Sequence, residues 1–154
     1  VNSKSIHLHK LNEILFIVSS IIFNIAVGGV YISSKIDAAK INSSFPLKIF
    51  GAIVVLLIIP FTISLIGYIK DKARKKIIIS HIFILFYLFL ELMLDYILKI
   101  PFREILAIHI PYILIFYAAA FSMIGVSRII NKKMGLLVIA TFLILIGCLI
   151  YSLI

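Results

Sequence analysis

The stretch IIISHIFILFYLFLELMLDYIL, residues 77–98, is too long and too apolar for a helix of a small water-soluble protein. Fifteen of its residues are Ile, Leu or Phe, and about 20 apolar residues suffice to cross the hydrocarbon core of a membrane. Glu91 and Asp95 interrupt its second half. An acid at the centre of a span costs about 2.5–3.5 kcal/mol, whereas each Ile, Leu or Phe contributes about 0.3–0.6 kcal/mol. The stretch therefore predicts a transmembrane helix that tolerates both acids.

The rest of the chain has the same character. Its 154 residues are 64% hydrophobic and only 14% charged, and a chain this short cannot hide so much apolar surface from water. Five apolar runs are long enough to span a membrane, and the joints between them are too short for an aqueous domain. The sequence therefore predicts an all-α bundle of five transmembrane helices with no soluble domain. The predicted spans lie near residues 13–33, 47–69, 77–98, 106–127 and 134–154.

Basic residues dominate the charge, with 15 Lys and Arg against 6 Asp and Glu. They fall at the ends of the apolar runs, where they act as determinants of membrane topology, so the excess does not indicate nucleic-acid binding. Ten lie on the side of the membrane that holds the N-terminus and five on the other side. Because cytoplasmic loops carry the excess of Lys and Arg, we expect a cell-membrane protein with a cytoplasmic N-terminus and an external C-terminus.

The third and fourth runs form a predicted helical hairpin whose turn centres near Phe102. Residues that lie equally far from this turn on the two helices should lie at similar depth in the membrane. Glu91 and Asp95 are four residues apart and share a helix face. Acids inside a span turn away from lipid, toward protein or water. The sequence therefore predicts a polar cluster in the outer third of the membrane, with Arg103 close above it; the cluster consists of Glu91, Asp95, His109 and Tyr112.

This cluster has several interpretations. It could be a proton or cation site for transport, a site for a divalent metal, or a polar seam against another subunit. A simpler alternative is a helical ion pair between Asp95 and Lys99, with Arg103 and Glu104 anchoring the turn. Pro111 adds a further alternative, in which residues 102–110 lie along the interface and the fourth span starts later.

A haem held by two histidines is not expected. His81 lies near the inner end of its run and His109 near the outer end of the next, so their depths should differ by roughly 20 Å. We expect His81 to be an interfacial side chain. The sequence identifies no cofactor.

Small and polar residues in other spans predict close helix packing. The packing positions are Ser20, Asn24 and Gly28 in the first span, and Ala118 and Ser122 in the fourth. Pro60 should kink the second span, with Thr62 and Ser64 available to bond the backbone groups that the kink releases.

The chain shows no nucleophile–base arrangement, no glycine-rich phosphate loop and no paired thiols. The first functional hypothesis is therefore non-enzymatic: a subunit of a larger membrane complex, or a transport-type protein, which contacts the lipid bilayer and either other membrane subunits or further copies of itself. The alternative is a membrane-embedded enzyme or metal-binding protein, with the residues Glu91, Asp95, Arg103, His109 and Tyr112.

Overall fold

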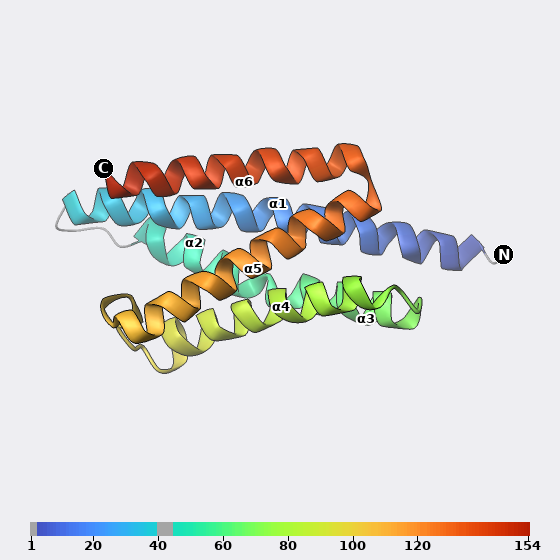
Figure 1. Ribbon diagram of the computed structural model, residues 1–154, viewed down its shortest axis with the longest axis horizontal. Coiled ribbons are helices and arrows are strands. Elements are labelled where there is room, and N and C mark those ends of the chain that lie inside the picture. The colour runs from blue at the N-terminus through green and yellow to red at the C-terminus, as the bar shows by residue number, and fades with distance from the viewer. Residues whose placement is uncertain (1–2, 40–44) are drawn as a thin grey trace.

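The computed structural model describes residues 3–39 and 45–154, without the side chains of residues 3–9, 37–39, 45, 47 and 103. It is a bundle of long helices, and no strand occurs within these ranges (Figure 1). The α-helices are α1 (Ser3–Ala39), α2 (Phe45–Leu56), α3 (Ile58–Lys70), α4 (Lys75–Glu91), α5 (Leu106–Ile130) and α6 (Lys132–Leu153). A π-helix, η1 (Leu92–Ile97), continues α4, and a 3₁₀ helix, η2 (Phe102–Glu104), precedes α5.

Five segments are long and apolar enough to cross a membrane, which confirms the predicted fold class. They are Lys10–Ile36, Lys48–Lys70, Lys75–Ile97, Leu106–Ile130 and Lys132–Leu153. Their length and hydropathy identify a multi-pass membrane protein. Each boundary lies within a few residues of the run predicted from the sequence.

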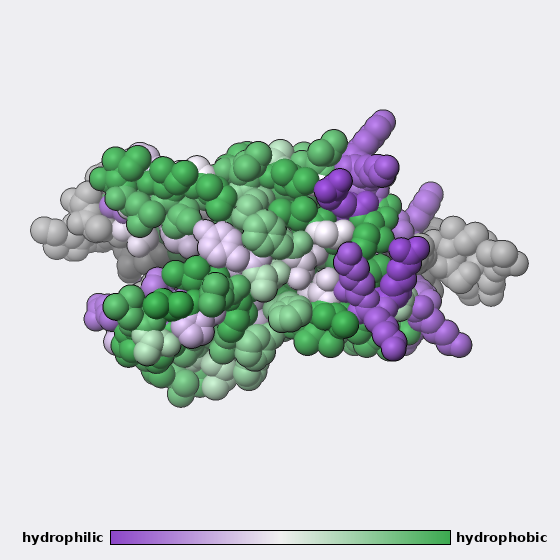
Figure 2. Space-filling view, in the orientation of Figure 1, coloured by the Kyte–Doolittle hydropathy of each residue, from purple (hydrophilic) through white to green (hydrophobic). Residues whose placement is uncertain are grey.

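The polar residues gather at one end of the bundle. The turn from α3 to α4 and the turn from α5 to α6 both lie at this end, and the C-terminus lies at the other (Figure 1). Hydrophilic side chains cluster there in Figure 2, while hydrophobic side chains cover most of the middle of the same face. This distribution suits a bundle whose sides meet lipid and whose basic end meets lipid headgroups.

The second span is divided into α2 and α3 at Leu57. Pro60 lies in the first turn of α3, where its missing N–H leaves the carbonyl of Leu56 without a helical donor. The Thr62 hydroxyl donates instead to the carbonyl of Ile58, at 2.6 Å. The helix is therefore interrupted where the sequence predicts a kink. The hydroxyls of Thr62 and Ser64, however, bond the Ile58 carbonyl and the His81 ring, and not the carbonyl that Pro60 leaves without a donor.

The third span does not end as a regular α-helix. The wider turns of η1 replace the α-helix after Glu91, and the chain leaves the helix before Lys99, whose backbone is left-handed with φ 50°. Lys99 is exposed. A spacing of four residues brings side chains together on one face only within a continuous helix, so this backbone does not favour the ion pair predicted between Asp95 and Lys99.

α1 and α6 pack closely along their length. Asn24 on α1 is buried and donates hydrogen bonds to the Thr141 hydroxyl, at 2.9 Å, and to the Val138 carbonyl, at 3.3 Å. One turn later, a Cβ atom at Gly28 would lie 3.3 Å from the sulfur of Cys148, so the glycine permits the close approach of the two helices. Ser20, one turn earlier, is buried and bonds to the carbonyl of Phe16 in its own helix.

The packing face of α5 lies beside the predicted one. Ala119 and Ala120 are fully buried, whereas Ala118 and Ser122 are half-buried at the edge of this face. All sides of the helix are apolar near this point, so the sequence pattern does not show which side meets protein.

Candidate functional site

A buried chain of hydrogen bonds joins α4 to α5. The Tyr112 hydroxyl on α5 donates to the carboxylate of Glu91, the last residue of α4. The Tyr87 hydroxyl lies 2.9 Å from the Tyr112 hydroxyl. Since Tyr112 uses its single proton toward Glu91, Tyr87 is the donor in the second bond. The protons therefore point in one direction, from Tyr87 through Tyr112 to Glu91.

Protein atoms surround this chain on nearly all sides. Glu91 is 6% exposed, Tyr87 2% and Tyr112 8%. The ring of Phe102, from the connector before α5, packs 4.6 Å from the ring of Tyr112 between centroids. Phe23 on α1 meets the ring of Tyr87 edge-to-face at 5.7 Å. Aromatic rings thus separate the hydrogen-bonded groups from lipid.

Local sequence explains how the three groups meet. Tyr87 and Glu91 are four residues apart on α4 and therefore share a face. α5 is helical from Leu106 onward, so Pro111 lies inside a continuous helix, and the fourth span carries Tyr112 level with Glu91 as the counting from Phe102 predicts. Tyr87 was missed by the sequence reasoning. Its spacing from Glu91 is the signal that could have identified it.

Two further members of the predicted cluster are described, His109 on α5 and Asp95 on η1. The His109 ring stacks on the Tyr112 ring at 6.3 Å, and its buried Nδ1 has no hydrogen-bond partner. Asp95 is half-buried on η1. The side chain of Arg103 lies outside the described residues. In the described parts of the chain, no three His, Cys, Asp or Glu residues are grouped so that they could hold a metal ion.

A second buried polar pair lies nearer the basic end. His81 is completely buried, which contradicts its expected interfacial position, because its helix face points toward α1 and α3. Its Nδ1 lies 2.8 Å from the carbonyl of Ile77 and its Nε2 lies 3.2 Å from the Ser64 hydroxyl. A carbonyl only accepts, so Nδ1 carries the proton and Nε2 accepts from Ser64. The rings of Phe16 and Tyr68 pack against the imidazole, at 4.8 and 5.2 Å.

The two polar groups are separated by an apolar layer. Ile84 on α4 is fully buried between them. Six residues separate His81 from Tyr87, which corresponds to a rise of about 9 Å along the helix. Both ring nitrogens of His81 have neutral hydrogen-bond partners. No protein-family model, curated protein or solved structure matches this chain.

Proposed function

We propose that this protein is a transport-type membrane protein in which Glu91, Tyr112 and Tyr87 form a proton site inside the bundle. The observation that carries the proposal is the burial of the Glu91 carboxylate within a span, in a hydrogen bond with Tyr112. Burying an ionisable group at membrane depth is costly, and such groups characteristically mark ion or proton pathways. The hydrogen bonds from Tyr87 to Tyr112 and from Tyr112 to Glu91 make the Glu91 carboxylate the final acceptor of the chain, which is where a proton would bind.

The ligand chemistry favours a proton over a metal cation. Ca²⁺ takes six to eight oxygen ligands and Mg²⁺ about six. The hydrogen-bonded chain offers one carboxylate and two phenol groups, which supply fewer oxygen ligands than either cation takes. A single proton on Glu91 requires no further ligand.

The positive charges support an orientation for the site. We propose that the end with the α3–α4 and α5–α6 turns is cytoplasmic, because it carries most of the Lys and Arg residues. The Glu91 site would then lie in the outer half of the membrane, within reach of protons from outside.

Proton flux in reconstituted vesicles tests the function. Vesicles that contain the wild-type protein should acidify or alkalinise faster than empty vesicles when a pH gradient and a membrane potential are imposed. Glu91→Gln should reduce the proton flux to that of empty vesicles, because the side-chain amide of Gln neither binds nor releases a proton at the pH values of such a gradient. Glu104→Gln, which neutralises an exposed acid in the connector, should leave the flux unchanged.

The result also separates this function from the other hypotheses. Equal flux for the wild type and Glu91→Gln, or no flux from the wild type, contradicts the proton site. A partner protein recovered by gentle detergent extraction, together with absent flux, would support a subunit of a larger complex instead.

A further inference from the structure

The end of the bundle that holds the α3–α4 and α5–α6 turns carries a strongly positive surface, visible in Figure 2. Eight of the described Lys and Arg residues lie in or beside the two turns, and all eight side chains are exposed. We call them the basic surface; they are Lys70, Lys72, Arg74, Lys75, Lys76, Arg128, Lys132 and Lys133. The described carboxylates at this end are those of Glu13 and Asp71. Two carboxylates cannot neutralise eight cations, so a large positive excess remains whatever pairs they form.

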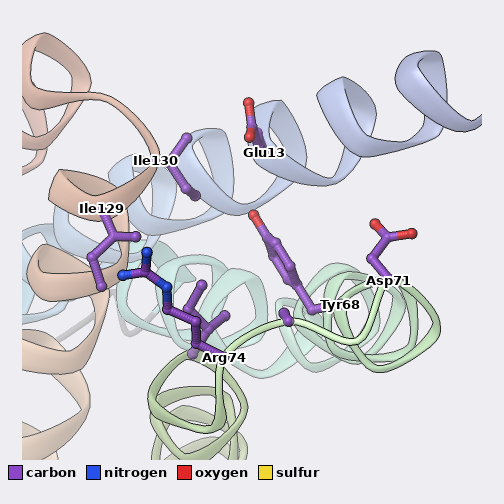
Figure 3. A pocket seen from close by; sticks show the side chains of 8 residues that line it. Glu13, Tyr68, Asp71, Arg74, Ile129 and Ile130 are labelled. Carbon is purple, nitrogen blue, oxygen red and sulfur yellow. The ribbon is translucent and has the colours of Figure 1, made fainter. Parts of the chain in front are cut away.

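The two turns lie side by side. Arg74 from the α3–α4 turn lines one pocket together with Ile129 and Ile130 from the end of α5. Figure 3 shows the Arg74 guanidinium beside Ile129, directed away from the two carboxylates. Ile129 follows Arg128 in the chain. The two arginines, one on each turn, therefore belong to neighbouring parts of a single surface.

Contact with α6 holds the first carbons of the Arg128 side chain. A Cβ atom added at Gly135 would lie 2.8 Å from the Cα of Arg128 and closer still to its Cγ. A larger residue at Gly135 would therefore push the start of α6 away from the end of α5. Arg128 is exposed beyond this contact. A side chain whose first carbons are already held loses less conformational freedom when its guanidinium binds a ligand.

The basic surface lies at the level of the phospholipid headgroups. Two of the candidate spans end at Lys70 and Ile130, and the following ones begin at Lys75 and Lys132. The ends of a span meet the region where headgroups adjoin the hydrocarbon core. Ile129 is 41% exposed beside the charged groups, where it can contact the first carbons of an acyl chain. Lipid phosphates are therefore the anions closest to this surface.

We propose that the basic surface binds diphosphatidylglycerol, a phospholipid whose two phosphates are joined by a glycerol, with one phosphate at Arg74 and the other at Arg128. A guanidinium binds phosphate through paired hydrogen bonds, and both turns add lysines. Basic sites between transmembrane helices suit headgroups of this kind. A lipid with a single phosphate would leave one of the two guanidinium groups without an anion. Because the cations of the surface repel one another, a lipid with two negative charges also stabilises the bundle.

Native mass spectrometry and thermal unfolding of the protein in mild detergent test the proposal. The protein is titrated separately with diphosphatidylglycerol, phosphatidylglycerol and phosphatidylcholine. We expect diphosphatidylglycerol to bind about tenfold more tightly than phosphatidylglycerol and to raise the unfolding temperature most. A two-chain form of diphosphatidylglycerol has as many acyl chains as phosphatidylglycerol, and it should keep the preference because both phosphates remain. Equal binding of this form and of phosphatidylglycerol would overturn the proposal.

Inorganic pyrophosphate distinguishes a lipid from a soluble anion, because it carries two phosphates and no acyl chain. At the concentration of the lipid it should not displace diphosphatidylglycerol, which also makes apolar contacts at Ile129. Displacement would assign the basic surface to a soluble anion and overturn the proposal of a lipid.

Three variants locate the binding site. Arg74→Gln and Arg128→Gln should each weaken diphosphatidylglycerol binding about tenfold, to nearly that of phosphatidylglycerol, because each leaves one phosphate without its guanidinium. Lys48→Gln is the matched control, since it removes an exposed positive charge at the other end of the bundle and should bind as the wild type does. An equal loss in Lys48→Gln, or an unchanged lipid preference in both arginine variants, would overturn the proposal. The comparison of lipids requires no variant, so a variant that fails to fold leaves the test intact.

Discussion

His81→Ala should destabilise the protein more than other single truncations in the spans, by about 2–5 kcal/mol in the free energy of unfolding. The imidazole is completely buried between α1, α3 and α4. Its removal leaves a cavity beside Phe16 and Tyr68 and removes the acceptor of the Ser64 hydroxyl. Both effects act inside a closely packed bundle, where neighbouring side chains refill space only in part.

Chemical unfolding in detergent, followed by circular dichroism, measures this effect. Ile82→Ala is the matched control, because Ile82 follows His81 on α4 but is 54% exposed on the outer surface of the helix. We expect this variant to change the free energy of unfolding by no more than about 0.5 kcal/mol. Similar losses for the two variants would show that His81 does not hold α1, α3 and α4 together.

Tyr112→Phe should lower the free energy of unfolding by about 1–3 kcal/mol. An ordinary hydrogen bond between membrane helices contributes about 0.6 kcal/mol. This one exceeds the average because its acceptor is a buried carboxylate, and because the Tyr87 hydroxyl loses its acceptor at the same time. The same variant should slow proton flux, since Glu91 keeps its carboxylate but loses the hydroxyl that links it to Tyr87.

Tyr117→Phe provides the control on the same helix. Tyr117 is half-buried and makes ring contacts with Phe116 and Phe121, and its hydroxyl makes no hydrogen bond with the side chains that the structure describes. Removal of its hydroxyl should therefore change the free energy of unfolding little and leave the proton flux unchanged. If Tyr112→Phe unfolds and transports as Tyr117→Phe does, then the Glu91–Tyr112 bond contributes neither to stability nor to proton transfer.

The number and bounds of the spans could be predicted because they depend on local composition. A run of apolar residues that reaches the length of the hydrocarbon core becomes a helix whatever its neighbours are, since lipid cannot satisfy an open backbone. The depth of polar residues followed from the same reasoning. Counting from Phe102 placed Glu91 level with Tyr112, and the structure joins them.

The direction in which each helix face points could not be predicted in the same way. In water, an apolar stripe identifies the buried side of a helix, whereas in a membrane both the lipid side and the protein side are apolar. For this reason the sequence does not distinguish Ala118 from Ala119 as the packing position on α5. The place of His81 near the end of its run likewise did not show that its side chain faces α1 and α3. The change from α4 to the π-helix η1 after Glu91, and the left-handed backbone at Lys99, follow no residue pattern in the sequence.

Labelling of single cysteines tests the central claim, a bundle of five crossings in which α4 and α5 run antiparallel and enclose Glu91. In a Cys148→Ser background, cysteines replace three exposed lysines, giving the variants Lys72→Cys, Lys99→Cys and Lys132→Cys. A reagent that does not cross membranes should react with positions 72 and 132 from one side and with position 99 only from the other. Reaction of position 99 from the same side as position 72 would mean that α4 does not cross the membrane. Glu91 would then not lie within a membrane span, and the proposed proton site would be wrong.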